Sequence, residues 1–177
     1  GRAVVVREAP PEEHEALGIL AERAYRAGGH LEDDHGYDAV LLDAASRAQP
    51  GPLLAAHLDG RLVGTATVTP AGSPHAEVAR EGETEFRFLA VDPDAGRRGV
   101  ARALVDAVVA HARAVGSHAV VCCVIDWNEP GHRLYRGYGF TRAPERDWTP
   151  VPGVDLLAYT LPVPPSPVPP SPAVAPA

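Results

Sequence analysis

A glycine- and arginine-rich turn between a predicted strand and a predicted helix is the segment best suited to bind a phosphate group. Residues 91–102 read VDPDAGRRGVAR. The first turn of such a helix offers unpaired N–H groups and the positive end of the helix dipole. Gly99 allows close approach to the backbone, and Ala101 is small enough not to block a ligand. The alternative is an ordinary glycine turn with solvated arginines.

A second group of polar and aromatic residues follows in residues 126–140, which read DWNEPGHRLYRGYGF. The pattern predicts a short helix over Pro130 to Arg136. Seven residues make nearly two helical turns, so Asn128 and Tyr135 are expected to project to the same side. From this pattern alone, Tyr135 is better explained as a core aromatic residue of an amphipathic helix.

The third segment is a predicted strand, Glu85–Val91, that carries charge into a sheet. Alternation of side chains gives two faces, one with Phe86, Phe88 and Ala90 and the other with Glu85, Arg87, Leu89 and Val91. If helices cover both faces of the sheet, Glu85 and Arg87 need a polar cleft. Burial would raise the pKa of the Glu85 carboxyl, which suits a general base near neutral pH. The alternative is a structural Glu85–Arg87 pair that faces solvent.

Taken together, these segments resemble the GNAT superfamily of acetyl-CoA-dependent N-acetyltransferases, and most closely bacterial members without an assigned substrate. The glycine turn is similar to the family's pyrophosphate loop, Q/R-x-x-G-x-G/A. Gly99 and Ala101 match that pattern, whereas Gly96 stands where Gln or Arg is expected. The resemblance extends over roughly residues 3–161, but its specific motifs occupy only 85–104 and 126–140.

The later segment is similar to the family's other signature, N-x-x-A-x-x-x-Y-x-x-x-G-F. Asn128, Tyr135, Gly139 and Phe140 fall in register with it. Gly131 replaces the usual small alanine. Both motifs are present in the expected order, which favours a catalytic Tyr135 over a core aromatic.

The resemblance implies that acetyl-CoA is the co-substrate and that no metal is used. It implies that the acyl donor lies where strands 85–91 and 119–125 splay apart. The residues that would bind it are Leu89, Ala90, Val91, Arg97, Arg98, Gly99, Val100, Ala101, Arg102 and Asn128. The N–H of Leu89 would polarise the thioester carbonyl, and Arg97 and Arg98 would supply the positive charge that Gly96 lacks.

The resemblance also implies the catalytic residues. Glu85 would accept the proton of a small-molecule primary amine, the amine would attack the thioester directly, and Tyr135 would protonate the departing thiolate. Two other functions stay open. One is a non-catalytic acyl-CoA-binding or regulatory module on the same fold. The other is a protein N-terminal acetyltransferase with an open peptide groove, whereas a small-amine enzyme should have a closed pocket walled by residues 28–38 and 142–153.

Three further clusters have several interpretations. The residues His30, Glu32, Asp33, Asp34 and His35 could form an acidic rim that favours a cationic amine, a metal site without regular ligand spacing, or a solvated loop. The segment 142–148 could line the acceptor pocket or form a salt-bridged loop. The adjacent Cys122 and Cys123 point to opposite faces of a strand, which predicts two small core residues, with a reactive thiol as the alternative.

Composition excludes several classes of function. The net charge of −7 argues against nucleic acid as the main partner and is compatible with a cationic substrate. All 16 basic residues are arginine, which excludes Schiff-base chemistry on lysine and a P-loop NTPase. The sequence shows neither a bilayer-spanning run nor a signal segment, so we expect no membrane partner and a cytoplasmic location. The oligomeric state stays open, with a homodimer among the alternatives.

The elements that must position these residues follow the order β-α-α-β-β-β-α-β-α-β. Apolar periodicity predicts helices over 11–27, 37–48, 100–115 and 130–136, and strands over 4–7, 53–58, 62–68, 85–91, 119–125 and 156–161. This order predicts an α/β fold with a mixed sheet and helices on both faces, and the resemblance makes that sheet mostly antiparallel. Residues 1–161 are expected to form one domain, and residues 162–177 a flexible proline-rich tail.

Overall fold

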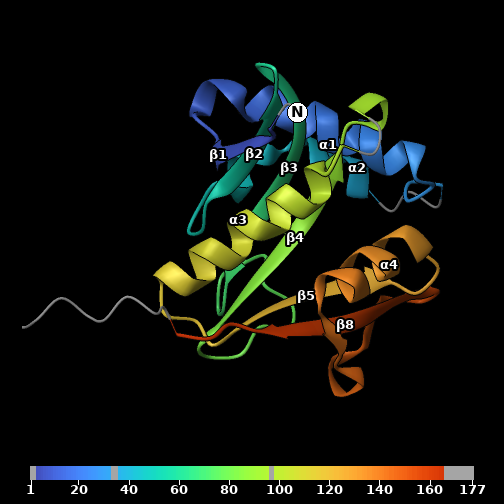
Figure 1. Cartoon of the computed structure of the whole chain (residues 1–177). Helices are drawn as coiled ribbons and strands as arrows, with labels where there is room; N and C mark the ends of the chain where they lie inside the picture. The colour runs from blue at the N-terminus through green and yellow to red at the C-terminus, as the bar shows by residue number, and fades with distance from the viewer. Residues whose placement is uncertain (1–2, 33–35, 96–97, 166–177) are drawn as a thin grey trace, which may run out of the picture.

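The computed structural model describes residues 3–32, 36–95 and 98–165 of the chain. Its strands are β1 (Val5–Glu8), β2 (Leu53–Leu58), β3 (Arg61–Pro70), β4 (Glu83–Val91), β5 (Ala119–Ile125), β6 (Thr141–Arg142), β7 (Trp148–Val151) and β8 (Val154–Pro162). Its α-helices are α1 (His14–Ala27), α2 (Tyr37–Leu42), α3 (Val100–Ala114) and α4 (Glu129–Tyr138) (Figure 1). Outside the described residues lie the proposed ligand-binding Arg97, the acidic residues Asp33 and Asp34, His35, and most of the proline-rich tail.

The eight strands form one mixed sheet in the order β1-β2-β3-β4-β5-β8-β6, with β7 paired to β8. Strands β4 and β5 run parallel, and the other neighbouring pairs are antiparallel. The β4–β5 pairing covers only three positions, from Glu83 opposite Ala119 to Glu85 opposite Val121. Strand β5 instead pairs with β8 along its whole length. The sheet therefore divides into two halves that are joined at one end and diverge at the other.

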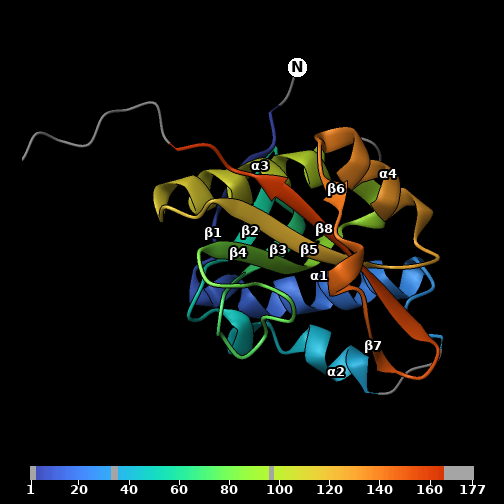
Figure 2. The ribbon, with the colours of Figure 1, turned by 90° about the horizontal axis from the view of Figure 1, so that it is seen from below.

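Helices cover both faces of this sheet, as the sequence predicts. Figure 2 shows α1 and α2 on one face and α3 and α4 on the other. Helix α3 buries its apolar stripe, including Leu104, Val105 and Val108, against the sheet. In the part of the chain that the structure describes, no helix is long and apolar enough to cross a bilayer.

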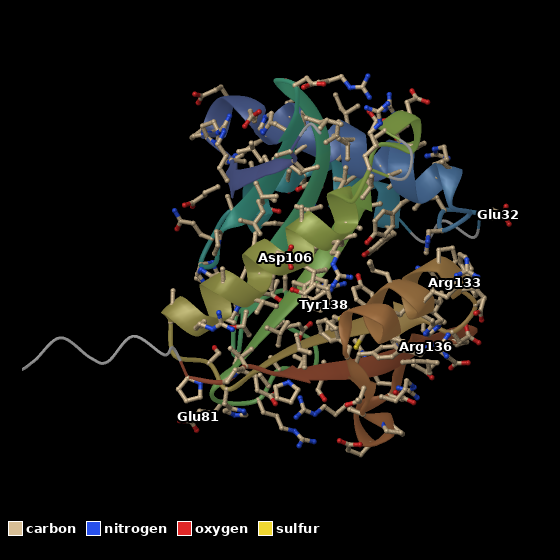
Figure 3. The ribbon with its side chains drawn as sticks, in the orientation of Figure 1. Glu32, Glu81, Asp106, Arg133, Arg136 and Tyr138 are labelled. Carbon is tan, nitrogen blue, oxygen red and sulfur yellow. The ribbon has the colours of Figure 1, made fainter. Side chains whose placement is uncertain are left out.

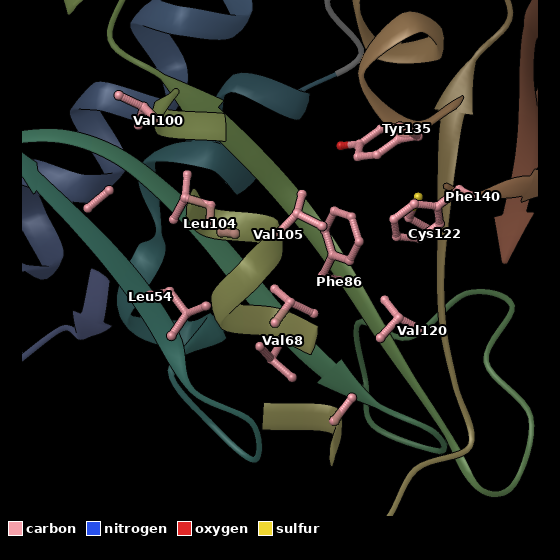
Figure 4. Close-up of a cluster of buried hydrophobic side chains, with 14 of the residues drawn as sticks. Leu54, Val68, Phe86, Val100, Leu104, Val105, Val120, Cys122, Tyr135 and Phe140 are labelled. Carbon is pink, nitrogen blue, oxygen red and sulfur yellow. The ribbon is translucent and has the colours of Figure 1, made fainter. Parts of the chain in front are cut away.

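The main core cluster fills the space between the sheet and helices α3 and α4 (Figure 4). It joins Leu104 of α3, Phe86 of β4, Val120 of β5 and Tyr135 of α4. Full burial of side chains of this size contributes roughly 1.5–3 kcal/mol each. Because the cluster draws on all four elements, the same packing that stabilises the fold also fixes their positions around the diverging strands.

The predicted helix over 37–48 is interrupted in the structure. Helix α2 ends at Leu42, and a separate 3₁₀ turn follows at Ala44–Arg47. The break occurs at Asp43, whose side chain accepts a hydrogen bond from the N–H of Ser46 and so caps the new turn. The short strands β6 and β7 were also not predicted, because two and four residues carry too little alternation to be recognised.

The predicted faces of β4 are wrong beyond Arg87. Phe88 has a positive φ of 56°, and the β3–β4 register shifts between Thr65 and Thr67. This β-bulge places an extra residue in β4 and reverses the alternation that follows. As a result, Phe86 packs in the α3–α4 cluster, whereas Phe88 and Ala90 pack with residues of α1 and α2.

The close approach of α3 to the sheet predicts that Gly64 cannot be enlarged cheaply. A Cβ at Gly64 would lie 2.7 Å from Cγ1 of Val100 and 3.1 Å from Cδ1 of Leu104. Gly64→Ala should therefore lower the free energy of unfolding by about 1–3 kcal/mol, measured by urea denaturation. The control is Gly137→Ala on α4, where a Cβ meets nothing within 4 Å. That change should raise stability by up to about 1 kcal/mol, and equal effects of the two changes would contradict the packing argument.

Candidate active site

A cleft of about 560 Å³ opens where β4 and β5 diverge. Its walls come from both faces of the sheet. The α3–α4 face contributes Phe86, Val124, Asn128 and Tyr135, and the α1–α2 face contributes Tyr25, Tyr37 and Phe88. Two reactants that enter from opposite faces could therefore meet between the strands.

The β4 edge of this cleft carries a stretch of backbone without sheet partners. Among the described residues, Phe88 and Leu89 have no register partner in either β3 or β5. The Phe88 ring is held by two guanidinium groups, those of Arg47 at 4.5 Å and Arg87 at 4.4 Å from its centroid. Such cation–π contacts offset the strain of a positive φ at Phe88. The bulge thus places backbone polar groups near Leu89 at the cleft wall. The carbonyl oxygen of a bound ligand could accept a hydrogen bond from an N–H group there.

The start of α3 keeps the features of an anion site. Gly99 is the N-cap residue with φ 77°, and no side chain caps the helix. A Cβ at Gly99 would meet nothing within 4 Å, so the space in front of the helix is open. The exposed Arg98 lies beside it. Strand β4 lines the cleft up to Val91, and this open helix start follows eight residues later in the chain.

Arg102 makes a contact that the sequence did not reveal. Its guanidinium lies 5.0 Å from the ring centroid of Tyr138, whose hydroxyl donates a hydrogen bond to Oδ1 of Asp106. Figure 3 shows Tyr138 and Asp106 facing each other between α3 and α4. Arg102 therefore helps to join α3 to α4, the helix whose Tyr135 lines the cleft.

Asn128 and Tyr135 both line the cleft, although Asn128 precedes the helix. It is the N-cap residue of α4, and its Oδ1 accepts a hydrogen bond of 3.2 Å from the N–H of Gly131. A Cβ at Gly131 would lie 2.7 Å from Nδ2 of Asn128. Glycine at position 131 thus leaves room for this particular conformation of the Asn128 amide.

Tyr135 is both a core residue and a cleft residue. Its ring packs against Phe86, Phe140 and Tyr159, and it is 7% exposed. Figure 4 shows its hydroxyl pointing away from Phe140 and Cys122. Burial raises the pKa of the Tyr135 phenol well above its usual value, so the group is protonated at neutral pH. A protonated phenol at the cleft wall can act as a general acid.

Glu85 is 1% exposed, and its carboxylate is occupied by the loop that precedes β4. It accepts hydrogen bonds from the N–H groups of Glu77, Val78 and Ala79 at 2.8–3.0 Å. Burial raises the pKa of Glu85, and these hydrogen bonds oppose the rise. The side chain is not part of the cleft wall, so it holds the loop in place. Its expected role as the base stays a prediction.

The carboxylate that does line the cleft belongs to Glu77, which the sequence did not single out. Its Oε1 lies 3.0 Å from Nε of Arg87, and its side chain is 13% exposed. Glu77 stands in an irregular loop where no periodicity separates it from its neighbour Glu81. Only the contacts that Glu77 makes with Glu85 and Arg87 in the folded structure distinguish it from Glu81.

The segment 142–148 is a salt-bridged loop. Arg142 donates two hydrogen bonds to the carboxylate of Asp147, and Arg146 pairs with Glu83 at the start of β4. The cleft is instead walled by the following residues, Pro150 and Val151. This loop therefore shapes the cleft only by fixing the strands beside it.

The two cysteines lie on the cleft wall without the character of nucleophiles. Cys122 is buried in the core cluster of α3 and α4, and Cys123 is partly buried. Burial raises the pKa of Cys123 to about 12, so its thiol is protonated at neutral pH. A thiolate is needed for nucleophilic attack, and this environment disfavours it.

The described part of the acidic cluster borders the cleft through His30. The His30 ring packs at a tilt against Tyr25 and Trp127, with ring centroids 5.1 Å and 4.7 Å apart, whereas Glu32 is exposed. Burial lowers the pKa of His30 and favours its neutral form. Within residues 3–32, 36–95 and 98–165, no three His, Cys, Asp or Glu side chains are grouped so as to hold a metal ion.

Comparison with known proteins identifies one family. Residues 15–140 match the model of the acetyltransferase (GNAT) family. No curated protein matches the chain closely enough to count as a relative.

Solved structures of low sequence identity share the fold. The ribosomal-protein-S18-alanine N-acetyltransferase of Escherichia coli is 18% identical with a TM-score of 0.66, and the match covers 91% of this chain and 94% of that one. The PaiA N-acetyltransferase of Thermoplasma acidophilum, solved with coenzyme A, is 15% identical with a TM-score of 0.67, covering 88% and 98%. A GNAT-family acetyltransferase of Staphylococcus aureus Mu50 is 15% identical with a TM-score of 0.69, covering 91% and 99%.

Proposed function

This chain belongs to the acetyltransferase (GNAT) family, and we propose that it transfers an acetyl group from acetyl-CoA to a small-molecule primary amine. The observation that carries this proposal is the cleft between β4 and β5, which is lined from both faces of the sheet. The backbone bulge and a protonated tyrosine lie in its wall, and the uncapped start of α3 follows the end of β4. These are the groups that a thioester substrate needs.

The chemistry follows from those groups. The first turn of α3, from Gly99 to Arg102, would bind the pyrophosphate of acetyl-CoA through backbone N–H groups. Leu89 at the bulge would donate its N–H to the thioester oxygen as negative charge develops there. The amine nitrogen attacks the carbonyl carbon, the C–N bond forms and the C–S bond breaks. Tyr135 gives its proton to the sulfur, so CoA leaves as a thiol.

Direct transfer is favoured over a covalent acetyl-enzyme. The raised pKa of Cys123 disfavours its thiolate, so the cleft holds no activated thiol to carry the acetyl group. Attack by the amine in a ternary complex needs only that both substrates lie in the same cleft, and this proximity supplies much of the rate acceleration.

The walls of the cleft support a small acceptor over a peptide. Residues of the α1–α2 connection, His30 and Gly36, line it together with Pro150 and Val151 from the β7–β8 hairpin. These two segments are the ones expected to close a small-amine pocket, whereas an extended peptide needs an open groove. The position of Tyr135 in the wall counts against a module that only binds acyl-CoA.

Acetyl-CoA should stabilise the native protein and raise its melting temperature. A ligand present at about 100 times its Kd and bound only to the native state contributes roughly 2.7 kcal/mol. Gly99→Glu should abolish the shift because it introduces a side chain and a negative charge at the start of α3. Gly72→Glu is the matched control, since Gly72 also has a positive φ and open space around it. No shift of the wild-type protein at millimolar acetyl-CoA would reject donor binding.

Tyr135→Phe should slow acetyl transfer while leaving the Kd for acetyl-CoA nearly unchanged. Loss of a general acid is worth about 10²–10⁴-fold in rate, and the phenylalanine ring preserves the packing with Phe86 and Phe140. Single-turnover measurement of CoA release would isolate the chemical step. Tyr138→Phe on the same helix is the control and should retain the wild-type rate. Equal single-turnover rates for wild type and Tyr135→Phe would leave Tyr135 with a packing role only.

A further inference from the structure

The loop between β3 and β4 brings one carboxylate into the cleft. This loop, residues 71–82, lies on the same face of the sheet as α1 and α2 and appears in green in Figure 2. Within it, Glu77 lines the cleft together with Tyr25, Tyr37 and Cys123. The loop therefore meets the cleft on the face opposite to α3, where an acceptor would enter.

Three side chains of β4 fix this loop. Glu85 binds the backbone N–H groups of residues 77–79, and Glu83 accepts a hydrogen bond from the N–H of Arg80 at 2.8 Å. Arg87 donates to the carbonyl of His75 at 3.1 Å and pairs with the Glu77 carboxylate. A loop anchored on both sides of Glu77 holds that carboxylate in one position, as a catalytic group requires.

We propose that Glu77 accepts the proton of the attacking amine, and that Glu85 and Arg87 position it. This role rests on the proposed acetyl transfer. As the C–N bond forms, the amine nitrogen loses one proton to the Glu77 carboxylate, directly or through one water. The proton then passes to solvent, while Tyr135 supplies a different proton to the sulfur and regains one from solvent.

The surroundings of Glu77 suit this exchange. Burial raises its pKa to about 7, Arg87 opposes the rise, and Glu85 adds to it. The other titratable groups that face it are Tyr25, Tyr37 and Cys123, which are neutral at pH 7 because burial raises each of their pKa values. A base with a pKa near the working pH combines a large ionised fraction with a strong tendency to take the proton. When kcat/KM is calculated for the free, unprotonated amine, it should therefore rise with pH through about 7, as Glu77 ionises.

Glu77→Gln tests this role against Glu85→Gln and the control Glu81→Gln, an exposed residue of the same loop labelled in Figure 3. Glu77→Gln should lower kcat/KM on the order of 10²-fold or more near pH 7. It should also remove the rise in kcat/KM near pH 7 without changing the Kd for acetyl-CoA. Glu85→Gln should lower kcat as well but keep that rise, because it only loosens the loop. Glu81→Gln should match the wild-type protein.

A second readout does not depend on turnover. Carbon-13 NMR of glutamate carboxyls should show one resonance that titrates near pH 7 in the wild-type protein and is missing in Glu77→Gln. An ordinary carboxyl pKa for that resonance would overturn the proposal, as would a pH profile of Glu77→Gln parallel to the wild type. If Glu85→Gln loses the rise in kcat/KM near pH 7 and Glu77→Gln keeps it, the base is Glu85. Failure of the wild-type protein to acetylate any amine would reject the proposed function itself.

A different observation concerns the body of the acceptor. Ring contacts at 4.7–6.1 Å run from one aromatic residue to the next in the order Trp127, His30, Tyr25, Tyr37, Phe88 and His75. The four middle members of this row line the cleft. Strands β7 and β8 add the apolar side chains of Val151, Val154 and Leu156. Among the described residues, the only charged side chains of the lining are Glu77 and Arg87, and they pair with each other.

From this lining we infer that the acceptor is a primary monoamine on an aromatic or aliphatic body. Apolar walls stabilise a hydrocarbon chain in proportion to the area that it buries. A second ammonium group would have to leave water without an unpaired carboxylate in the described lining to receive it, which is costly. This inference also rests on acetyl transfer, but it does not depend on which carboxylate is the base.

The test compares ethylamine, butylamine and hexylamine, and then hexylamine with 1,6-diaminohexane. We expect kcat/KM to rise about fourfold per added methylene, which corresponds to ~0.8 kcal/mol, and the diamine to react at least tenfold more slowly than hexylamine. Val151→Glu places a carboxylate in the lining and should reduce the difference in kcat/KM between hexylamine and the diamine. Equal or faster reaction of the diamine, or no dependence on chain length, would overturn this inference. Absence of transfer to every amine would instead reject the proposed function.

Discussion

Strands β4 and β5 share three register positions before they diverge, and the candidate site lies in the space that this divergence opens. Pairing could have continued, because β5 is long enough and pairs with β8 along its whole length. It stops after Glu85, and three residues later the bulge at Phe88 leaves Phe88 and Leu89 without register partners in β3 as well. The cost of that irregular backbone is offset by the contacts of Arg47 and Arg87 with the Phe88 ring. The end of the β4–β5 pairing thus opens the cleft, and the bulge that follows supplies its unpaired backbone.

The polar face of β4 organises the acceptor side of the same cleft. Buried carboxylates are stable only when they are paired or hydrogen-bonded. Glu83 meets this requirement through Arg146, and Glu85 meets it through the backbone of residues 77–79. The buried carboxylates of Glu83 and Glu85 on this central strand therefore hold the loop 71–82 and segment 142–148 against the sheet. The loop in turn delivers Glu77 to the cleft.

Features set by local sequence could be predicted. The glycine at the start of α3, the register of Asn128 with Tyr135, and the order of elements all follow from spacing within a few residues, and the mixed sheet with helices on both faces is confirmed. The bulge at Phe88 could not be predicted, because a phenylalanine with positive φ leaves no mark in the pattern. Glu77 was missed for a related reason. Its environment is created by Glu85 and Arg87, eight and ten residues away across a loop, and by Tyr25 of α1, so no local pattern marks it.

The central claim is that both substrates meet in one cleft and react directly. Initial rates of CoA release, measured over a grid of acetyl-CoA and hexylamine concentrations, test it most directly. The structure predicts intersecting double-reciprocal lines, with one acetylated amine formed for each CoA released. Parallel lines, or an acetyl group found on the protein after incubation with acetyl-CoA alone, would contradict it.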